Sequence, residues 1–251
     1  MTSSDRPAAQ TVDDALTLLE EVATARGATL SELARATGMT TSKAYRLLGT
    51  LEQRGYLERR SGKAFELGPK LLHLGHRAAR GHPLVRAAAP VLQRLGVSFG
   101  ESVLLAVRVG LERVIVDTRD ARYGPQLSWP HDARLPLHSG ALGLCLLAYA
   151  PAEVLDTVLT ADLPAFTEHT LTSRAALERA LADIRKEHAF VAKHSYVRGV
   201  YSVASPILGA DRIAVAALSV VGAVARLDAA TEARMRVEVR DAAAEVAGYL
   251  T

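Results

Sequence analysis

The sequence predicts an α+β protein with an N-terminal winged helix-turn-helix, a linker helix and a C-terminal α/β domain that holds an antiparallel sheet. Three observations predict this class. Apolar residues recur at helical spacing between residues 12 and 51, a hairpin pattern with cations at its tip follows at 55–68, and β-branched runs flank helical patterns beyond residue 100. With 251 residues and 49% apolar composition, the chain is long enough to bury the cores of two domains.

Three short helices are predicted near the N-terminus. The first ends near Gly27 and carries apolar residues at helical spacing: Val12, Ala15, Leu16, Leu18, Leu19 and Val22. The second begins at Thr29, which stands three residues before Glu32 as in a capping box, and it stops at Gly38. The third ends at Gly55 and has the apolar positions Ala44, Leu47, Leu48 and Leu51. Helix, tight turn and helix together form a helix-turn-helix.

The third helix has an outer face whose composition suits DNA. At about 100° per residue, the positions opposite its apolar stripe are Ser42, Arg46, Gly49 and Gln53, with Lys43 and Tyr45 beside them. Arginine binds guanine through two hydrogen bonds, and hydroxyl groups bind phosphate. We therefore interpret this helix as a recognition helix for the major groove. The alternative is an ordinary solvated surface helix.

A β-hairpin, or wing, is predicted to follow the recognition helix, with its turn at Ser61-Gly62. Its tip carries Arg59, Arg60 and Lys63, which suits salt-dependent contact with the sugar-phosphate backbone or the minor groove. Residues 40–63 hold six Lys and Arg against two Asp and Glu, so this segment concentrates the basic charge. The candidate DNA-contacting residues are Thr40, Thr41, Ser42, Lys43, Tyr45, Arg46, Gln53, Arg59, Arg60 and Lys63.

A seam of apolar residues at 4,3 spacing runs from Leu67 to Leu95, as in a pair of packed helices. The tripeptide "GHP" at 81–83 interrupts it. Gly81 suits a helix end and Pro83 suits a first helical turn, so two helices with a bend are predicted. The first of them could pair with its copy in a second subunit. The alternative is that both helices pack only on their own domains.

The C-terminal part is predicted to be a sheet with helices against one face. Two strands, "ESVLLAVRVG" and "LERVIVDTR", are separated at Gly110, and two later ones, "VYSVASPIL" and "RIAVAALSVVG", have Asp211 in the turn between them. Helices are predicted from Ser139 to Tyr149 and from Arg174 to His188.

Several classes of protein and site are disfavoured. The longest apolar run, residues 141–150, is far shorter than the ~20 residues of a membrane span, and the polar N-terminus lacks a secretory pattern, so we expect a cytoplasmic protein without membrane contact. The single cysteine, Cys145, excludes an intrachain disulfide and is expected to be buried. No HExxH or GxSxG motif is present, and the remaining candidates form no catalytic or metal-binding pattern: His131, Asp132, His138, Ser139, His194 and Ser195. We expect no enzyme activity, metal or cofactor.

The sequence resembles the IclR-type bacterial transcription regulators. The resemblance rests on "LSELARATGMTTSKAYRLLGTLEQRGYLER", "FELGPKLLHLG", "LPLHSGALGLCLLA", "FTEHTLT", "GVYSVASPI" and "AALSVVG", which occur in the order of the family. It implies a winged helix-turn-helix, a linking helix and a C-terminal α/β effector domain similar to GAF-type sensor domains. It also implies a homodimer or a dimer of dimers on palindromic DNA.

A small-molecule site is expected where the "HSGALG" helix begins, because a helix N-terminus offers free N–H groups to a carboxylate or other anion. The resemblance adds the strands "GVYSVASP" and "ALSVVG". The candidate effector-binding residues are Ser139, Gly140, Ala141, Leu142, Gly143, Ser202 and Ser219. This chain departs from the family pattern at Gly140, Leu144, Ser195, Ser202 and Val221, which leaves fewer polar contacts, so a somewhat larger or less polar ligand is expected.

The predicted organisation is a disordered tail at 1–10, a winged helix-turn-helix at 11–70, a linker helix at 71–88 and an effector-binding and oligomerisation domain at 89–251. The predicted function is a DNA-binding transcription regulator whose affinity for its double-stranded DNA operator responds to a small organic effector. The alternatives are a DNA-binding architectural protein without an effector and an enzyme fused to a DNA-binding domain.

Overall fold

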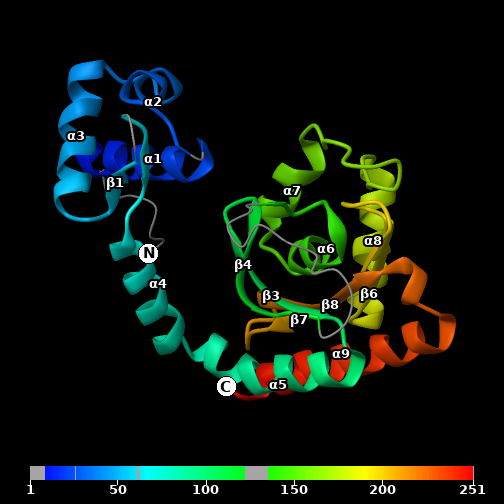
Figure 1. Ribbon diagram of the computed structural model, residues 1–251. Coiled ribbons are helices and arrows are strands. Elements are labelled where there is room, and N and C mark those ends of the chain that lie inside the picture. Colours follow the sequence, from blue (N-terminus) through cyan, green and yellow to red (C-terminus); the bar gives the residue numbers. More distant parts are fainter. Residues whose placement is uncertain (1–8, 26, 61–62, 122–134, 251) are drawn as a thin grey trace. The chain divides into compact units, whose positions relative to one another are not determined.

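The computed structural model describes residues 9–25, 27–60, 63–121 and 135–250, and the chain divides into two compact units, 1–80 and 81–251 (Figure 1). The predicted tail at 1–10 falls almost wholly outside the described residues. The limits predicted for the winged domain, the linker and the effector domain remain predictions.

The first unit contains α1 (Gln10–Ala25), α2 (Leu30–Ala36) and α3 (Thr41–Gln53), in the order that the apolar periodicity predicts. The capping box is present: Thr29 Oγ1 accepts a hydrogen bond from the N–H of Glu32, and Glu32 Oε2 accepts one from the N–H of Thr29 at 2.8 Å. The core joins the three helices to the strands that follow them, and its buried members include Leu18, Leu33, Ala44, Leu48, Leu57 and Phe65.

The wing consists of β1 (Leu57–Arg59) and β2 (Phe65–Leu67), which pair antiparallel with Leu57 opposite Leu67. Phe65 is fully buried, and its N–H donates to the carbonyl of Ala28 at 2.8 Å, so the hairpin is fixed to the segment before α2. The turn predicted at Ser61-Gly62 lies outside the described residues.

The linker consists of two helices, as "GHP" predicts: α4 (Pro69–Gly81) ends at the glycine, and α5 (Pro83–Phe99) begins at the proline. The two helices differ in burial. In α5, Ala88, Leu92 and Leu95 are buried in the core of the second unit. In α4, Leu72 is 69% exposed and Leu74 is 41% exposed.

The described part of the second unit contains an antiparallel six-stranded sheet in the order β5-β4-β3-β8-β7-β6. Its strands are β3 (Ser102–Val109), β4 (Glu112–Arg119), β5 (Leu135–Pro136), β6 (Phe190–Lys193), β7 (Val200–Leu208) and β8 (Ala214–Ala223). Gly110 joins β3 to β4 with a φ of +60°, a conformation that favours glycine. Asp211 lies in the β7–β8 turn, where its Oδ1 accepts from the N–H of Ile213.

Helices cover both faces of this sheet, so the prediction that they lie against one face is wrong (Figure 1). One face packs against α6 (Gly140–Ala148), α7 (Ala152–Thr160) and α8 (Arg174–Glu187), and the other against α5 and α9 (Ala229–Gly248). Strand alternation explains this arrangement: Leu104 and Ala106 face α6, whereas Val103 and Leu105 face α5 and α9. The periodicity did not reveal α9 because its buried face is made largely of alanine and valine between many charged residues.

None of the helices in the described ranges is long and apolar enough to cross a membrane. Cys145 is fully buried in α6, as expected, and this burial raises the pKa of its thiol.

Candidate functional site

The outer face of α3 is the first candidate site. Ala44 and Leu48 are buried against the core, while Ser42, Arg46 and Gln53 are exposed on the opposite side. Thr40 caps the helix by accepting from the N–H of Lys43 at 3.3 Å, which uses its hydroxyl oxygen as an acceptor and leaves its O–H available as a donor. Next to this face, Tyr45 is 60% exposed. At Gly49 an added Cβ would meet nothing within 4 Å, which leaves this part of the helix open to close approach.

Lys43 differs from the other predicted contacts because its ammonium forms an ion pair with Asp14 of α1. The Asp14 side chain is 9% exposed, and its Oδ1 also accepts from Nε2 of Gln10 at 3.2 Å. The hydrogen bond from Lys43 holds the pKa of Asp14 below its usual value; burial partly opposes this, and Gln10 adds to it. Lys43 therefore ties α3 to α1.

Two of the three wing cations are also engaged within the protein. Arg59 Nε lies 3.2 Å from Oε1 of Glu52, and its guanidinium carbon lies 4.7 Å from the centre of the Phe65 ring. Arg60 Nε lies 3.2 Å from Oε2 of Glu66, although its side chain is 76% exposed. Lys63 is exposed and makes no salt bridge to another described residue. These pairs lower the net charge that the wing presents.

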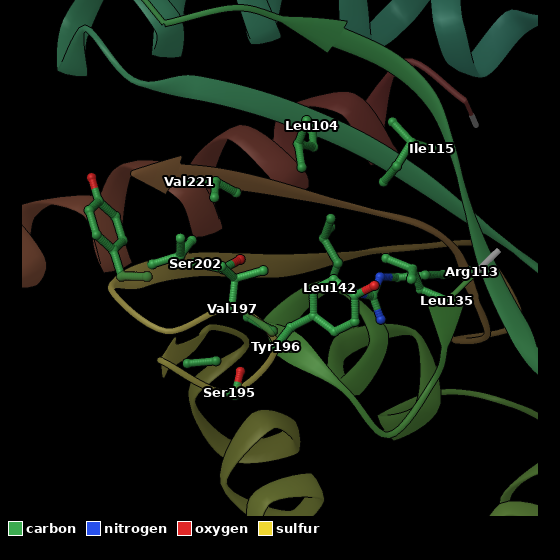
Figure 2. A pocket seen from close by; sticks show the side chains of 15 residues that line it. Leu104, Arg113, Ile115, Leu135, Leu142, Ser195, Tyr196, Val197, Ser202 and Val221 are labelled. Atoms are coloured by element: carbon green, nitrogen blue, oxygen red, sulfur yellow. The ribbon is translucent and has the colours of Figure 1, made fainter. Parts of the chain in front are cut away.

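The second candidate site is a cavity between the sheet and α6 (Figure 2). Strand residues of its lining include Leu104, Ile115, Leu135 and Val221, which make most of its wall apolar. The cavity has a volume of about 40 Å³, room for a few waters. The expectation of a somewhat larger or less polar ligand remains a prediction.

Four of the seven predicted effector residues line the cavity: Gly140, Ala141, Leu142 and Ser202. The other three lie beside it. Ser139 donates its hydroxyl to the carbonyl of Pro136 at 3.1 Å. At Gly143 an added Cβ would stand 2.5 Å from the Leu137 carbonyl oxygen, so this glycine allows close packing. The Ser219 hydroxyl is fully buried in β8 and has no hydrogen-bond partner among the described residues.

Arg113 of β4 also lines the cavity, and sequence reasoning missed it. Its side chain is buried; Nη1 donates to the carbonyl of Pro136 at 2.9 Å and to that of Ser139 at 2.5 Å. Nε has no hydrogen-bond partner within the described residues. Strand alternation could have found this residue, because Arg113 lies two positions before Ile115 and therefore on the same face of the sheet.

A loop of residues 194–199, between β6 and β7, contributes Ser195, Tyr196 and Val197 to the cavity (Figure 2). Two threonines of "FTEHTLT" fix this loop. Thr167 Oγ1 donates to the carbonyl of His194 at 2.7 Å, and Thr170 Oγ1 donates to that of Ser195 at 2.8 Å. This segment of the sequence thus positions part of the cavity wall.

The predicted histidines serve the structure. His138 is buried, with Nε2 3.0 Å from the carbonyl oxygen of Pro164 and its ring stacked on Phe166. His194 Nδ1 accepts from the N–H of Gly199 at 2.9 Å. His131 and Asp132 lie outside the described residues. Among the residues that the structure does describe, no cluster of three or more His, Cys, Asp or Glu could hold a metal ion.

Comparison with known proteins matches both units to domains of one protein family. The family model of the IclR helix-turn-helix domain matches residues 11–61, and that of the bacterial transcriptional regulator IclR C-terminal domain matches residues 76–247. The HTH-type transcriptional regulator BhcR of Paracoccus denitrificans is 30% identical over 246 residues, which cover 97% of this chain and 88% of that protein.

Solved structures agree with this result. An IclR transcriptional regulator from Alicyclobacillus acidocaldarius shares the fold, with a TM-score of 0.89 at 22% identity and coverage of 98% of this chain and 100% of that one. An IclR homologue from Microbacterium hydrocarbonoxydans, in complex with 4-hydroxybenzoate, has a TM-score of 0.79 at 27% identity and covers 96% of this chain and 98% of its own. The similarity therefore extends over nearly the whole chain.

Proposed function

This chain belongs to the IclR family of bacterial transcription regulators, and from that premise we propose that it binds a palindromic operator and that a small organic effector changes its affinity for this DNA. Family membership makes the protein a DNA-binding transcription regulator with a C-terminal effector domain, and not an enzyme. The operator, the contacts and the effector are what we propose here.

The exposed outer face of α3 carries the proposal for DNA. Its apolar stripe is buried, so Ser42, Arg46 and Gln53 are free to enter a major groove, with Tyr45 beside them. Thr40 and Thr41 at the start of the helix and Arg59, Arg60 and Lys63 in the wing are proposed to contact phosphates. We assign Lys43 mainly to the ion pair with Asp14, which holds the recognition helix on α1.

A homodimer, or a dimer of such dimers, is the proposed DNA-binding form. The exposed leucines of α4, Leu72 and Leu74, support this because a second copy of the helix would cover them. Two recognition helices related by a twofold axis would contact half-sites about one DNA turn, ~34 Å, apart. A palindromic operator is the sequence that matches this symmetry.

The cavity beneath α6 is the proposed effector site, formed by Gly140, Ala141, Leu142 and Ser202 together with residues of the 194–199 loop. The Microbacterium homologue, solved with 4-hydroxybenzoate, supports a small organic ligand in this family. An effector shifts DNA affinity only by binding the two DNA-binding arrangements unequally, typically by ~1–3 kcal/mol of coupling.

A footprint over the DNA upstream of the protein's own gene, repeated with a panel of metabolites, tests both operator binding and the response to an effector. The proposal expects one protected palindrome and at least one metabolite that changes the protein concentration needed for protection. Protection that no metabolite changes would favour the alternative, an architectural DNA-binding protein without an effector. Absence of sequence-specific protection would refute the proposed DNA contacts at that site.

A further inference from the structure

Arg113 places a positive charge in the wall of the cavity without an acidic partner among the described residues. Its side chain is 4% exposed. Within the described residues, every hydrogen bond of Arg113 is donated by Nη1: to the carbonyls of Pro136 and Ser139 and, at 3.2 Å, to the Ser139 hydroxyl. Nε makes no hydrogen bond there. A buried cation with an unpaired N–H is destabilising unless an anion or a hydrogen-bond acceptor comes to it.

The pKa of Arg113 also indicates a buried guanidinium that is charged and poorly solvated. Burial lowers the pKa of Arg113 to about 10, and the nearby phenol of Tyr196 only partly opposes that effect. The guanidinium therefore remains charged at neutral pH although water solvates it poorly. Its central carbon lies 5.9 Å from the centre of the Tyr196 ring, and Figure 2 shows that ring extending toward Arg113.

The start of α6 adds a second feature that favours an anion. The N–H groups in the first turn of a helix have no partner within that helix, and Gly140, Ala141 and Leu142 at this turn line the same cavity as Arg113. The opposite wall is apolar, with Leu104, Ile115 and Val221. Positive groups at one end and hydrocarbon at the other match a carboxylate with a short carbon chain.

We infer that Arg113 is a specificity-determining residue of the cavity and that it selects a small carboxylate. The carboxylate accepts hydrogen bonds from guanidinium N–H groups of Arg113 other than those of Nη1 and from the first-turn N–H groups of α6, and its carbon chain contacts the apolar wall. The cavity has room for a few waters, which matches a short carbon chain. This inference rests on the proposed effector site and adds the chemical class of its ligand.

A purely structural role for Arg113 is the competing explanation, since Nη1 binds carbonyls on both sides of the β5–α6 connection. Such a role requires only a donor at Nη1 and predicts no preference between charged and neutral ligands. Discrimination between an acid and its amide is therefore the informative measurement.

The experiment is isothermal titration calorimetry of the full chain with acetate, propionate, pyruvate, lactate and butyrate, each compared with its own amide. We expect at least one acid to bind, with its amide weaker by about 10- to 100-fold, as loss of a charge-assisted hydrogen bond predicts. This comparison needs no variant, so a folding defect cannot obscure it. Equal affinity for acid and amide, or no binding of any acid, would overturn the inference.

Variants then assign the preference to one residue. Arg113→Met should weaken binding of the acid by about 10- to 100-fold and leave binding of the amide unchanged, while Arg113→Lys should retain part of the preference. The control is Arg108→Met. Arg108 stands directly opposite Arg113 in the β3–β4 pair, but it is only half-buried, does not line the cavity and donates to the carbonyl of Gly110. We expect the control to bind the acid within about threefold of wild type, because a charge in contact with solvent is screened.

Circular dichroism confirms that each variant is folded. If Arg113→Met binds the acid as wild type does, Arg113 is structural and the inference fails. Because calorimetry contains no DNA, failure of the regulatory proposal gives a different result: acids bind in an Arg113-dependent way, yet the operator affinity does not change.

Discussion

Arg226 and Glu101 form a two-point ion pair at one end of the sheet. Nε of Arg226 donates to Oε1 of Glu101 at 2.8 Å, and Nη2 donates to Oε2 at 2.6 Å. The Glu101 side chain is 6% exposed, and its carboxylate lies against Gly222 of β8. A Cβ at position 222 would stand 2.5 Å from the carboxyl carbon, so glycine is needed there for the pair to form.

Gly222→Ala should therefore lower the free energy of unfolding by about 1–3 kcal/mol, because the added methyl group displaces the Glu101 carboxylate. Urea denaturation followed by circular dichroism measures this change. The control is Gly248→Ala in α9, where a Cβ meets nothing within 4 Å; it should be neutral or stabilising by up to about 1 kcal/mol. Equal stability of the two variants would contradict the prediction.

Lys43→Met should raise the pKa of Asp14 toward its ordinary value of 3.8, because the hydrogen bond from Lys43 is the main cause of its depression. In the wild type this depression stabilises the fold above the pKa of the unfolded chain, and the contribution is lost as pH falls through the lower pKa of the folded chain. Titration of the Asp14 carboxyl carbon by NMR gives the pKa. Lys70→Met, whose ammonium lies 4.9 Å from the centre of the Tyr56 ring, should leave it unchanged. An unchanged Asp14 pKa in Lys43→Met would show that the ion pair does not form in solution.

Arg46→Ala should weaken operator binding by about 1–3 kcal/mol without loss of folding, because the side chain is exposed opposite the buried stripe of α3. Gel-shift titration with the footprinted operator measures the affinity. Arg179→Ala is the control, since Arg179 is an exposed cation of α8 in the other unit. Wild-type affinity in the Arg46 variant would remove this face of α3 from the proposed interface.

Lys63→Gln should flatten the dependence of DNA affinity on salt by roughly 0.9 in the log–log slope, with operator and random DNA affected alike. Arg60→Gln should flatten it less, because Arg60 is paired with Glu66 in the free protein. Fluorescence anisotropy over a range of salt concentrations gives the slopes. A variant that loses only operator binding would indicate that the wing contacts bases.

The sequence predicted α2, α3 and the capping box of α2 because the signals are local: an apolar stripe, Thr29 three residues before Glu32, and a glycine after each helix. It did not predict that Thr40 caps α3. It did not predict Arg113, since a buried arginine violates the expectation that charged residues are exposed, although alternation places Arg113 on the same face of β4 as Ile115. The sequence also did not show that Lys43 and Arg59 form ion pairs within the protein. Their partners, Asp14 and Glu52, are identified by tertiary packing and not by a motif.

The loop of residues 194–199 is fixed through main-chain carbonyls, by Thr167 at His194 and by Thr170 at Ser195. These two bonds involve none of the side chains that Ser195, Tyr196 and Val197 direct at the cavity. Substitutions at these three consecutive codons can therefore alter the shape of the cavity while the loop keeps its anchoring. Descendants of this gene would have a short mutational route to new ligands that leaves the DNA-binding unit untouched.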